Sequence, residues 1–204
     1  MKGLYAIVDP EHCLGRDPLW VASEILHGGC AALQLRAKTL PDRVGLSLAR
    51  ALSARCQDHG VPFWMNDRVD LGLLSDAQGV HLGQGDLALP DARRLFPRAL
   101  LGLSTHDVAQ ARLAAAQGAD VIGFGPIFTT TSKLRPDPCV GLDGLRAVCD
   151  AVDIPVIAIG GIELTHAAQI AATGASYAAV ISAVCRASDP REAARALHDA
   201  LRAG

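Results

Sequence analysis

Short apolar runs alternate with amphipathic, alanine- and leucine-rich segments from one end of this 204-residue chain to the other. The apolar runs predict strands at residues 4–8, 31–36, 62–66, 79–82, 100–104, 121–124, 155–159 and 177–181. The segments between and after them predict helices at residues 18–28, 41–58, 67–75, 89–96, 106–117, 142–151, 163–173 and 189–202. Pro18, Pro41 and Pro190 support three of these helix starts, because the missing N–H of proline costs little in a first turn.

Nearly continuous apolar strands that alternate with helices indicate a parallel sheet buried on both faces. Eight strand–helix units close most economically into a (β/α)8 barrel, and 204 residues lie at the lower end of the range for that fold. An open doubly wound sheet is the alternative, but no Gly-x-Gly-x-x-Gly turn follows the first run. We therefore expect α/β architecture, with a single (β/α)8 TIM barrel domain over residues 1–204.

The overall composition excludes several classes of protein. The formal net charge is −2, so the basic footprint of a nucleic-acid-binding protein is missing. No apolar run approaches the roughly 20 residues that span a bilayer, and the N-terminus does not read as a signal peptide. The six cysteines are scattered without a Cys-x-x-Cys pair, which predicts reduced, mostly buried thiols. We expect a cytoplasmic protein without membrane or nucleic-acid partners, and a homo-oligomer stays open.

In a barrel of this type the active site lies at the carboxyl ends of the strands. The second run ends in Gln34, Arg36 and Lys38, and strand alternation puts Gln34 and Arg36 on the side opposite Leu33 and Leu35. An inward-facing pair near a barrel mouth needs an anionic or hydrogen-bonding partner, and the arginine fork suits phosphate oxygens. The alternative is a salt bridge from Arg36 or Lys38 to a carboxylate in a neighbouring loop.

Acidic residues follow the next two strands. Asp67 comes directly after Asn66, and Asp86 closes the segment Gly83-Gln84-Gly85-Asp86. Magnesium takes oxygen ligands and typically uses one or two carboxylates together with substrate phosphates and water. Two aspartates from neighbouring strands therefore predict a Mg²⁺ site that would hold a diphosphate. Asp67 could instead cap the following helix, and Asp86 could serve only its turn.

Polar groups also follow the fifth and sixth strands. Ser104 lies close enough to the mouth to bond a substrate, whereas Thr105 or Asp107 would cap a helix and His106 would lie at the surface or at the helix start. The irregular stretch 128–141 after the sixth strand is long for so compact a chain, which is typical of a functional or mobile loop. Its hydroxyl-rich run 129–133 would suit an oxyanion, although a solvated polar loop is the plainer interpretation.

The last two strands end in small residues. Gly160-Gly161 follow the seventh strand, and Ile181-Ser182 follow the eighth. Backbone N–H groups at these positions form the recurring phosphate site of barrels. The sequence thus predicts two anionic groups, a metal-bound diphosphate and a monophosphate, in a barrel placed to join two substrates.

Ordered motifs over essentially the whole chain resemble the thiamine-phosphate synthase family. They are Leu4-Tyr5 with Val8-Asp9, Gln34-Leu35-Arg36-Ala37-Lys38, Asn66-Asp67-Arg68-Val69-Asp70-Leu71, Gly79-Val80-His81-Leu82-Gly83-Gln84, the run 123–128 and the run 158–162. The resemblance implies a barrel that couples 4-amino-2-methyl-5-hydroxymethylpyrimidine diphosphate to 4-methyl-5-(2-phosphooxyethyl)thiazole, giving thiamine monophosphate and diphosphate. The implied chemistry is dissociative, because the aminopyrimidine ring expels diphosphate and the thiazole nitrogen captures the resulting cation.

By position, the resemblance also implies roles for individual residues. Arg36, Lys38 and Lys133 would be catalytic by stabilising the leaving group, and Asp67 and Asp86 would hold Mg²⁺. The substrate-binding residues would be Gln34, Leu35, Arg36, Ala37, Lys38, Asn66, Ser104, Thr130, Thr131, Ser132, Lys133, Gly161, Ile181 and Ser182. Of these, Thr130, Ser132, Gly161, Ile181 and Ser182 would receive the thiazole phosphate.

The chain departs from the family pattern in one loop, where Thr129 replaces a proline and Ser132 replaces a threonine of Pro-Thr-x-Thr-Lys. Two other functions stay open. A thiazole tautomerase-like paralogue would lose the diphosphate-binding charges, and some paralogues place a histidine where this chain has Pro126, which cannot transfer a proton. A non-catalytic barrel would bind thiazole phosphate without turnover.

Overall fold

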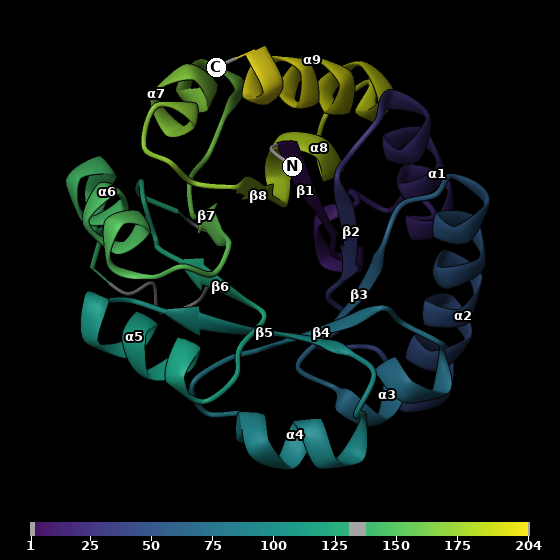
Figure 1. Cartoon of the computed structure of the whole chain (residues 1–204). Helices are drawn as coiled ribbons and strands as arrows, with labels where there is room; N and C mark the ends of the chain where they lie inside the picture. The colour runs from purple at the N-terminus through teal and green to yellow at the C-terminus, as the bar shows by residue number, and fades with distance from the viewer. Residues whose placement is uncertain (1–2, 131–137, 204) are drawn as a thin grey trace.

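The computed structural model describes residues 3–130 and 138–203. Within these residues eight parallel strands form a closed barrel in which each strand pairs with its neighbours in chain order, and β8 returns to β1. The strands are β1 (Gly3–Val8), β2 (Ala32–Leu35), β3 (Phe63–Asn66), β4 (Gly79–Leu82), β5 (Leu100–Thr105), β6 (Val121–Phe124), β7 (Val156–Ile159) and β8 (Tyr177–Val180). The predicted barrel is confirmed, and the open sheet is excluded (Figure 1).

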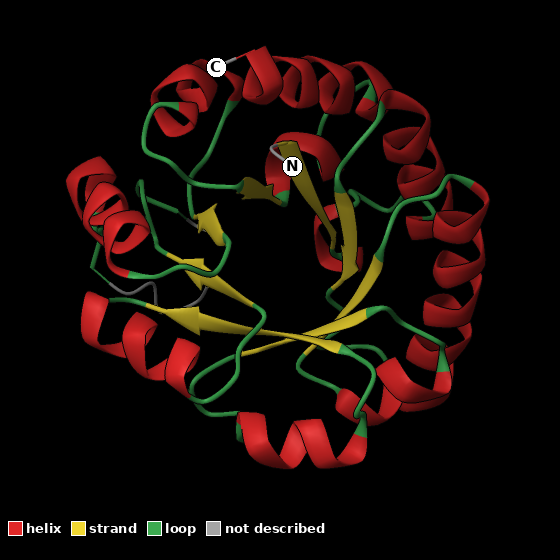
Figure 2. Cartoon of the chain, viewed as in Figure 1, coloured by secondary structure: helices red, strands yellow, loops and turns green. Residues whose placement is uncertain are grey.

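Helices surround the barrel on its outer side, apart from the short α8, which lies inside this ring next to β8 and β1 (Figure 2). They are α1 (Pro18–Gly28), α2 (Asp42–Asp58), α3 (Val69–Leu74), α4 (Leu89–Leu95), α5 (Val108–Ala116), α6 (Gly141–Ala151), α7 (Ala167–Ala171), α8 (Ser182–Cys185) and α9 (Pro190–Ala203). Helix α9 packs against α1, α7 and β1, so the last helix closes the outer ring beside the first.

Three short helical elements differ from the sequence prediction. Two 3-10 turns, η1 (Pro10–His12) and η2 (Leu164–His166), follow β1 and β7, and the four-residue helix α8 follows β8. The helix predicted at 163–173 is therefore divided into η2 and a short α7. Such short elements span about one turn, so they leave no hydrophobic period in the sequence.

The core has two parts, as expected for a sheet buried on both faces. One cluster fills the space between the strands and the helices, and Leu33 and Leu35 belong to it with no exposed surface. A smaller cluster fills the barrel interior and consists of Tyr5, Ile7, Ala32, Trp64, Val121, Ile157 and Ala179. Strand alternation explains this division, because successive side chains on a strand point to opposite faces.

All six cysteines lie in the described part of the chain and are free thiols. Cys13, Cys30, Cys56 and Cys185 are buried, and Cys139 is exposed, so the prediction of mostly buried thiols is confirmed. Among the described residues no helix is both long enough and apolar enough to cross a membrane.

Candidate active site at the barrel mouth

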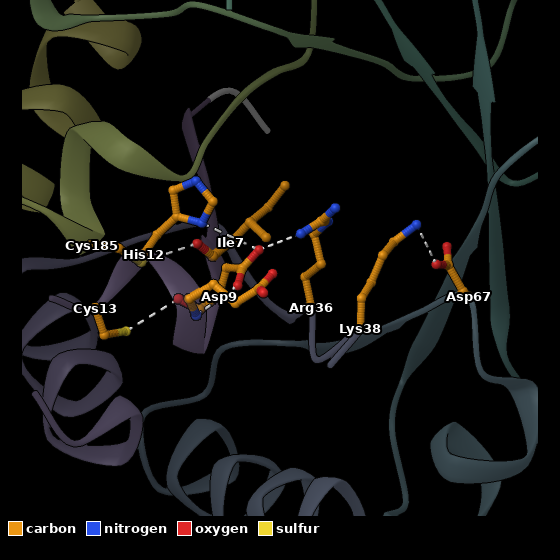
Figure 3. A network of polar contacts seen from close by, with 9 residues as sticks. Ile7, Asp9, His12, Cys13, Arg36, Lys38, Asp67 and Cys185 are labelled. Carbon is orange, nitrogen blue, oxygen red and sulfur yellow. Dashed lines mark hydrogen bonds and ion pairs between the residues drawn. The ribbon is translucent and has the colours of Figure 1, made fainter. Parts of the chain in front are cut away.

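Arg36 is held by a carboxylate that the sequence reasoning did not assign. Asp9 follows β1 with only 1% of its surface exposed, and its Oδ2 atom forms an ion pair with Arg36 Nη1 (Figure 3). The other oxygen, Oδ1, accepts the Glu11 N–H at 3.0 Å and so caps η1. Strand β1 pairs with its chain neighbour β2, and the Arg36 N–H continues that pairing by donating to Val8 O at 2.9 Å. The alternative of a salt bridge to a loop carboxylate is therefore the arrangement observed for Arg36.

Gln34 points into the barrel, as the strand alternation predicts. Its Nε2 donates to the Tyr5 hydroxyl at 2.9 Å, and the side chain is 2% exposed. Leu35 points the other way, into the core between strands and helices, so any substrate contact of Leu35 would use its main chain. Ala37 is half-buried and packs against that same core.

Lys38, which follows β2, forms an ion pair with Asp67, which follows the neighbouring strand β3. Lys38 Nζ lies 3.0 Å from Asp67 Oδ2, and the lysine side chain is half-exposed (Figure 3). The main chain of Asp67 is left-handed, with φ of 61°, a conformation that aspartate adopts more readily than most residues. Helix α3 begins only after Arg68, which is its N-cap residue, so the interpretation of Asp67 as a helix cap is wrong.

The carboxyl groups of Asp67 and Asp86 lie within hydrogen-bonding reach of each other. Burial raises the pKa of Asp67, the Lys38 ammonium lowers it, and the neighbouring Asp86 raises it again. Asp86 also serves its own turn, because its Oδ2 accepts the Gly83 N–H at 2.7 Å and its N–H donates to Gly83 O. Asp86 therefore stabilises its own turn and also lies beside Asp67. Two adjacent carboxyl groups stay together by sharing a proton or a cation.

Asp67 and Asp86 are the candidate ligands for a metal ion at the mouth. No group of three or more His, Cys, Asp or Glu side chains gathers in residues 3–130 and 138–203. A cation here would therefore have two protein carboxylates and would complete its shell with other oxygens. This donor set matches Mg²⁺, which keeps several waters and commonly binds through one or two carboxylates plus substrate phosphates.

Ser104 at the end of β5 is partnered by His81, which the sequence reasoning left without a role. His81 Nε2 lies 3.2 Å from Ser104 Oγ, and the Gln84 amide donates to Ser104 O at 2.6 Å. The imidazole fits because Gly102 has no side chain, and a Cβ there would lie 2.3 Å from His81 Nδ1. Burial lowers the pKa of His81 to about 4, so its ring is neutral at neutral pH. Asn66 ends β3 and is half-buried.

The three residues after Ser104 have structural contacts. Asp107 caps α5 by accepting the Gln110 N–H at 2.7 Å, as predicted. Thr105 is buried and donates to Gly123 O instead, so it is not a cap. His106 is half-buried just before α5, and its Nδ1 lies 2.7 Å from Gly125 O.

The loop after β6 runs directly over the turn after β7. Ile127 N–H donates to Ile159 O at 2.9 Å, and Phe128 N–H donates to Gly160 O at 3.0 Å. Gly161 has φ of 64°, and a Cβ on it would lie 2.4 Å from Thr129 O. Only glycine fits this crossing.

The predicted loop residues are only partly visible. Thr130 is described and half-buried. Thr131, Ser132 and Lys133 lie outside the described residues.

The β8 end carries the remaining predicted site residues. Ile181 is the N-cap residue of α8, Ser182 is its first residue, and both are half-buried. Arg16 holds the far end of α8, since its guanidinium donates to Ala187 O at 2.8 Å and to Cys185 O. The structure thus places the described predicted site residues at or near the carboxyl ends of β2, β3, β4, β5, β7 and β8, together with the loop after β6.

The family described as thiamine monophosphate synthase matches residues 4–184. The chain belongs to this family. A thiamine-phosphate synthase from Anaeromyxobacter dehalogenans is 44% identical over 205 residues, which cover 100% of this chain and 90% of that protein. One from Moorella thermoacetica is 43% identical over 199 residues, with 97% of this chain and 95% of that protein covered.

A solved structure from Pyrococcus furiosus, a thiamine phosphate pyrophosphorylase, superposes with a TM-score of 0.91 at 34% identity. The match covers 98% of this chain and 96% of that one. Membership of the thiamine-phosphate synthase family makes the chain a transferase of thiamine biosynthesis, as the motif resemblance implied.

Proposed function

We propose that this chain joins the pyrimidine diphosphate to the thiazole phosphate with the help of Mg²⁺, releasing diphosphate and thiamine monophosphate from one barrel domain spanning residues 1–204. The observation that carries the proposal is the Asp67–Asp86 carboxyl pair with Lys38 beside it. The two aspartates follow β3 and β4, and β3 pairs with β2, which is directly followed by Arg36. A cytoplasmic location, which suits an enzyme of thiamine biosynthesis, stays a prediction from the sequence, and a homo-oligomer stays open.

Asp67 and Asp86 would hold the Mg²⁺, because their carboxyl groups already approach each other at the solvent-facing mouth. When bound there, Mg²⁺ supplies positive charge to phosphate oxygens and so favours departure of diphosphate. Lys38 favours the ionised form of Asp67, because its ammonium offsets part of the rise in pKa that burial causes.

The side chains of the chain itself would bind and orient the diphosphate. Arg36 is aimed by its ion pair with buried Asp9, so its guanidinium is ordered before substrate arrives. Lys38, two residues further along the loop, adds a mobile point charge, and Lys133 would add another. Electrostatic stabilisation of a leaving group of this kind requires no side-chain nucleophile. The neutral ring of His81 would orient the Ser104 hydroxyl toward the pyrimidine, with Gln34 and Asn66 nearby.

The thiazole phosphate would bind on the opposite side of the mouth. The main-chain N–H of Gly161 would contribute to this phosphate site, and Thr130 would add a hydroxyl. Ile181 and Ser182 would complete this phosphate site, as the family resemblance implies. The nitrogen of the thiazole would then face the carbon that loses diphosphate, and this alignment supplies much of the catalysis.

A diphosphate-release assay tests the proposal. We expect release only when both substrates and Mg²⁺ are present, and loss of release on chelation of the metal. Release from the wild type without a divalent metal would contradict the Mg²⁺ site. The two alternatives give other results: a tautomerase-like paralogue would rearrange a thiazole without releasing diphosphate, and a non-catalytic barrel would bind thiazole phosphate in a calorimetric titration without turnover.

A further inference from the structure

The rings of His166 and Phe128 stack face to face, although the two residues follow different strands. Their centroids lie 3.9 Å apart with an interplanar angle of 19°. Phe128 belongs to the loop after β6, and His166 ends η2 after β7. The stacked pair therefore links the loop after β6 to the segment after β7.

The orientation of the His166 ring is set within its own turn. His166 Nδ1 accepts the Glu163 N–H at 3.1 Å, and the Glu163 side chain accepts the His166 N–H in return. Because Nδ1 accepts, the neutral ring carries its proton on Nε2. Because one capping-box bond holds the ring at Nδ1 and the other holds the His166 main chain, the ring offers Phe128 a defined surface.

The main chain of Phe128 is restrained on the other side. Its N–H donates to Gly160 O at 3.0 Å, and the next residue, Thr129, passes directly over Gly161. Any sideways movement of Phe128 would therefore shift Thr129 and the position of Thr130 relative to Gly161.

We propose that His166 is a positioning residue for the thiazole-phosphate half of the site. It acts through Phe128, whose stacked ring fixes the crossing of Thr129 over Gly161 and thereby the approach of Thr130. The inference rests on the proposed function, because Thr130 and Gly161 are two of the proposed phosphate contacts. His166 itself is not placed among the groups that touch substrate.

Two substitutions separate the two contacts of the histidine ring. His166→Asn keeps an acceptor for the Glu163 N–H but removes the stacked ring, whereas His166→Phe keeps a ring and removes the acceptor. His59→Ala is a matched control, because the exposed His59 ring meets His27 edge-on at 5.1 Å, beside the outer helices α1 and α2. The measurements are kcat, the KM of each substrate, the unfolding midpoint, and the calorimetric Kd for 4-methyl-5-(2-phosphooxyethyl)thiazole.

We expect His166→Asn to raise the KM for thiazole phosphate by about three- to tenfold, the range that a stacked aromatic pair supports. The KM for the pyrimidine diphosphate should change by less than about twofold, and His166→Phe and His59→Ala should resemble the wild type. Phe128→Leu should reproduce the His166→Asn effect, and combining the two should add little.

Two results would overturn the inference: wild-type kinetics in His166→Asn, or an equal rise in both KM values with a lower unfolding midpoint, which indicates a merely structural role. A wild type that releases no diphosphate would refute the proposed function instead. In that case the Kd for thiazole phosphate tests the inference. Weaker binding by His166→Asn, with wild-type binding by His166→Phe and His59→Ala, supports the positioning role. An unchanged Kd in His166→Asn, or no binding by the wild type, overturns the inference.

Discussion

Lys38 is the counter-charge of Asp67: its Nζ lies 3.0 Å from Asp67 Oδ2, on the same carboxyl group that faces Asp86. One ammonium thus stands beside two acidic groups at the open end of the barrel. A cation bound by the aspartates would replace this ion pair and leave Lys38 available to an anionic substrate. Lys38 is therefore expected to influence metal binding as well as diphosphate binding.

Substitution of Lys38 should change the pH dependence of metal binding. Lys38 lowers the pKa of Asp67, so Lys38→Met lets that pKa rise further above its ordinary value. The carboxylate then needs a higher pH to ionise, and the acidic limb of Mg²⁺ activation should move to higher pH. The check is the Mg²⁺ concentration for half-maximal diphosphate release between about pH 5 and 8. Lys38→Arg should keep the wild-type limb, and an unshifted limb in Lys38→Met would contradict the coupling.

Loss of the second carboxylate should weaken metal binding without unfolding the barrel. Asp86→Asn keeps an oxygen for the Gly83 N–H but removes the charge that faces Asp67. We expect the Mg²⁺ requirement to rise by more than about tenfold, with an unfolding midpoint near that of the wild type. Asp91→Asn is the control, because Asp91 is an exposed partner of Arg94 on α4. Equal Mg²⁺ titrations for the two variants would show that Asp86 is not a ligand.

His81 should make the barrel less stable in acid. Its pKa is lowered by burial to about 4, below the value of about 6.5 expected in an unfolded chain. Between these values the unfolded state binds the extra proton, so stability is full above about pH 6.5 and falls as pH drops toward 4, by up to about 1.4 kcal/mol per pH unit. Urea unfolding at several pH values checks this slope. His81→Asn should flatten it, and an identical slope in the variant would refute the assignment to His81.

A side chain should be less well tolerated at Gly161 than at Gly118, another glycine with a left-handed backbone. A Cβ on Gly161 would lie 2.4 Å from Thr129 O, whereas Gly118, with φ of 85°, has nothing within 4 Å of such an atom. Gly118→Ala should cost about 1 kcal/mol of unfolding free energy from backbone strain alone. Gly161→Ala should cost more than about 2 kcal/mol, since it adds a clash, and should raise the KM for thiazole phosphate. Denaturant unfolding of both variants measures the difference, and equal costs would contradict the close crossing.

The sequence predicted the barrel because each strand and helix carries its own local signal. Buried strands are uniformly apolar, prolines mark three helix starts, and closure follows from the number of units. The same rule placed Gln34, Asp67, Asp86 and Ser104 at one end, since carboxyl ends of parallel strands share an edge. Helix α8 escaped prediction because four residues show no period.

The partners within the site could not be predicted, because they join residues far apart in the chain. Asp9 meets Arg36 across 27 positions, and only the pairing of β1 with β2 brings them together. The cap interpretation of Asp67 failed for a local reason. A left-handed backbone at Asp67 delays the helix by one residue and turns the carboxylate toward Lys38.

The two carboxylate oxygens of Asp9 have separate roles, since one ends the first strand in an ordered turn and the other steadies Arg36. Glutamate at this position would preserve the charge yet lengthen the arm by one methylene, and would disturb both contacts at once. The turn that follows the first strand and the guanidinium proposed to bind an anion therefore share one carboxyl group, so a change at Asp9 alters both.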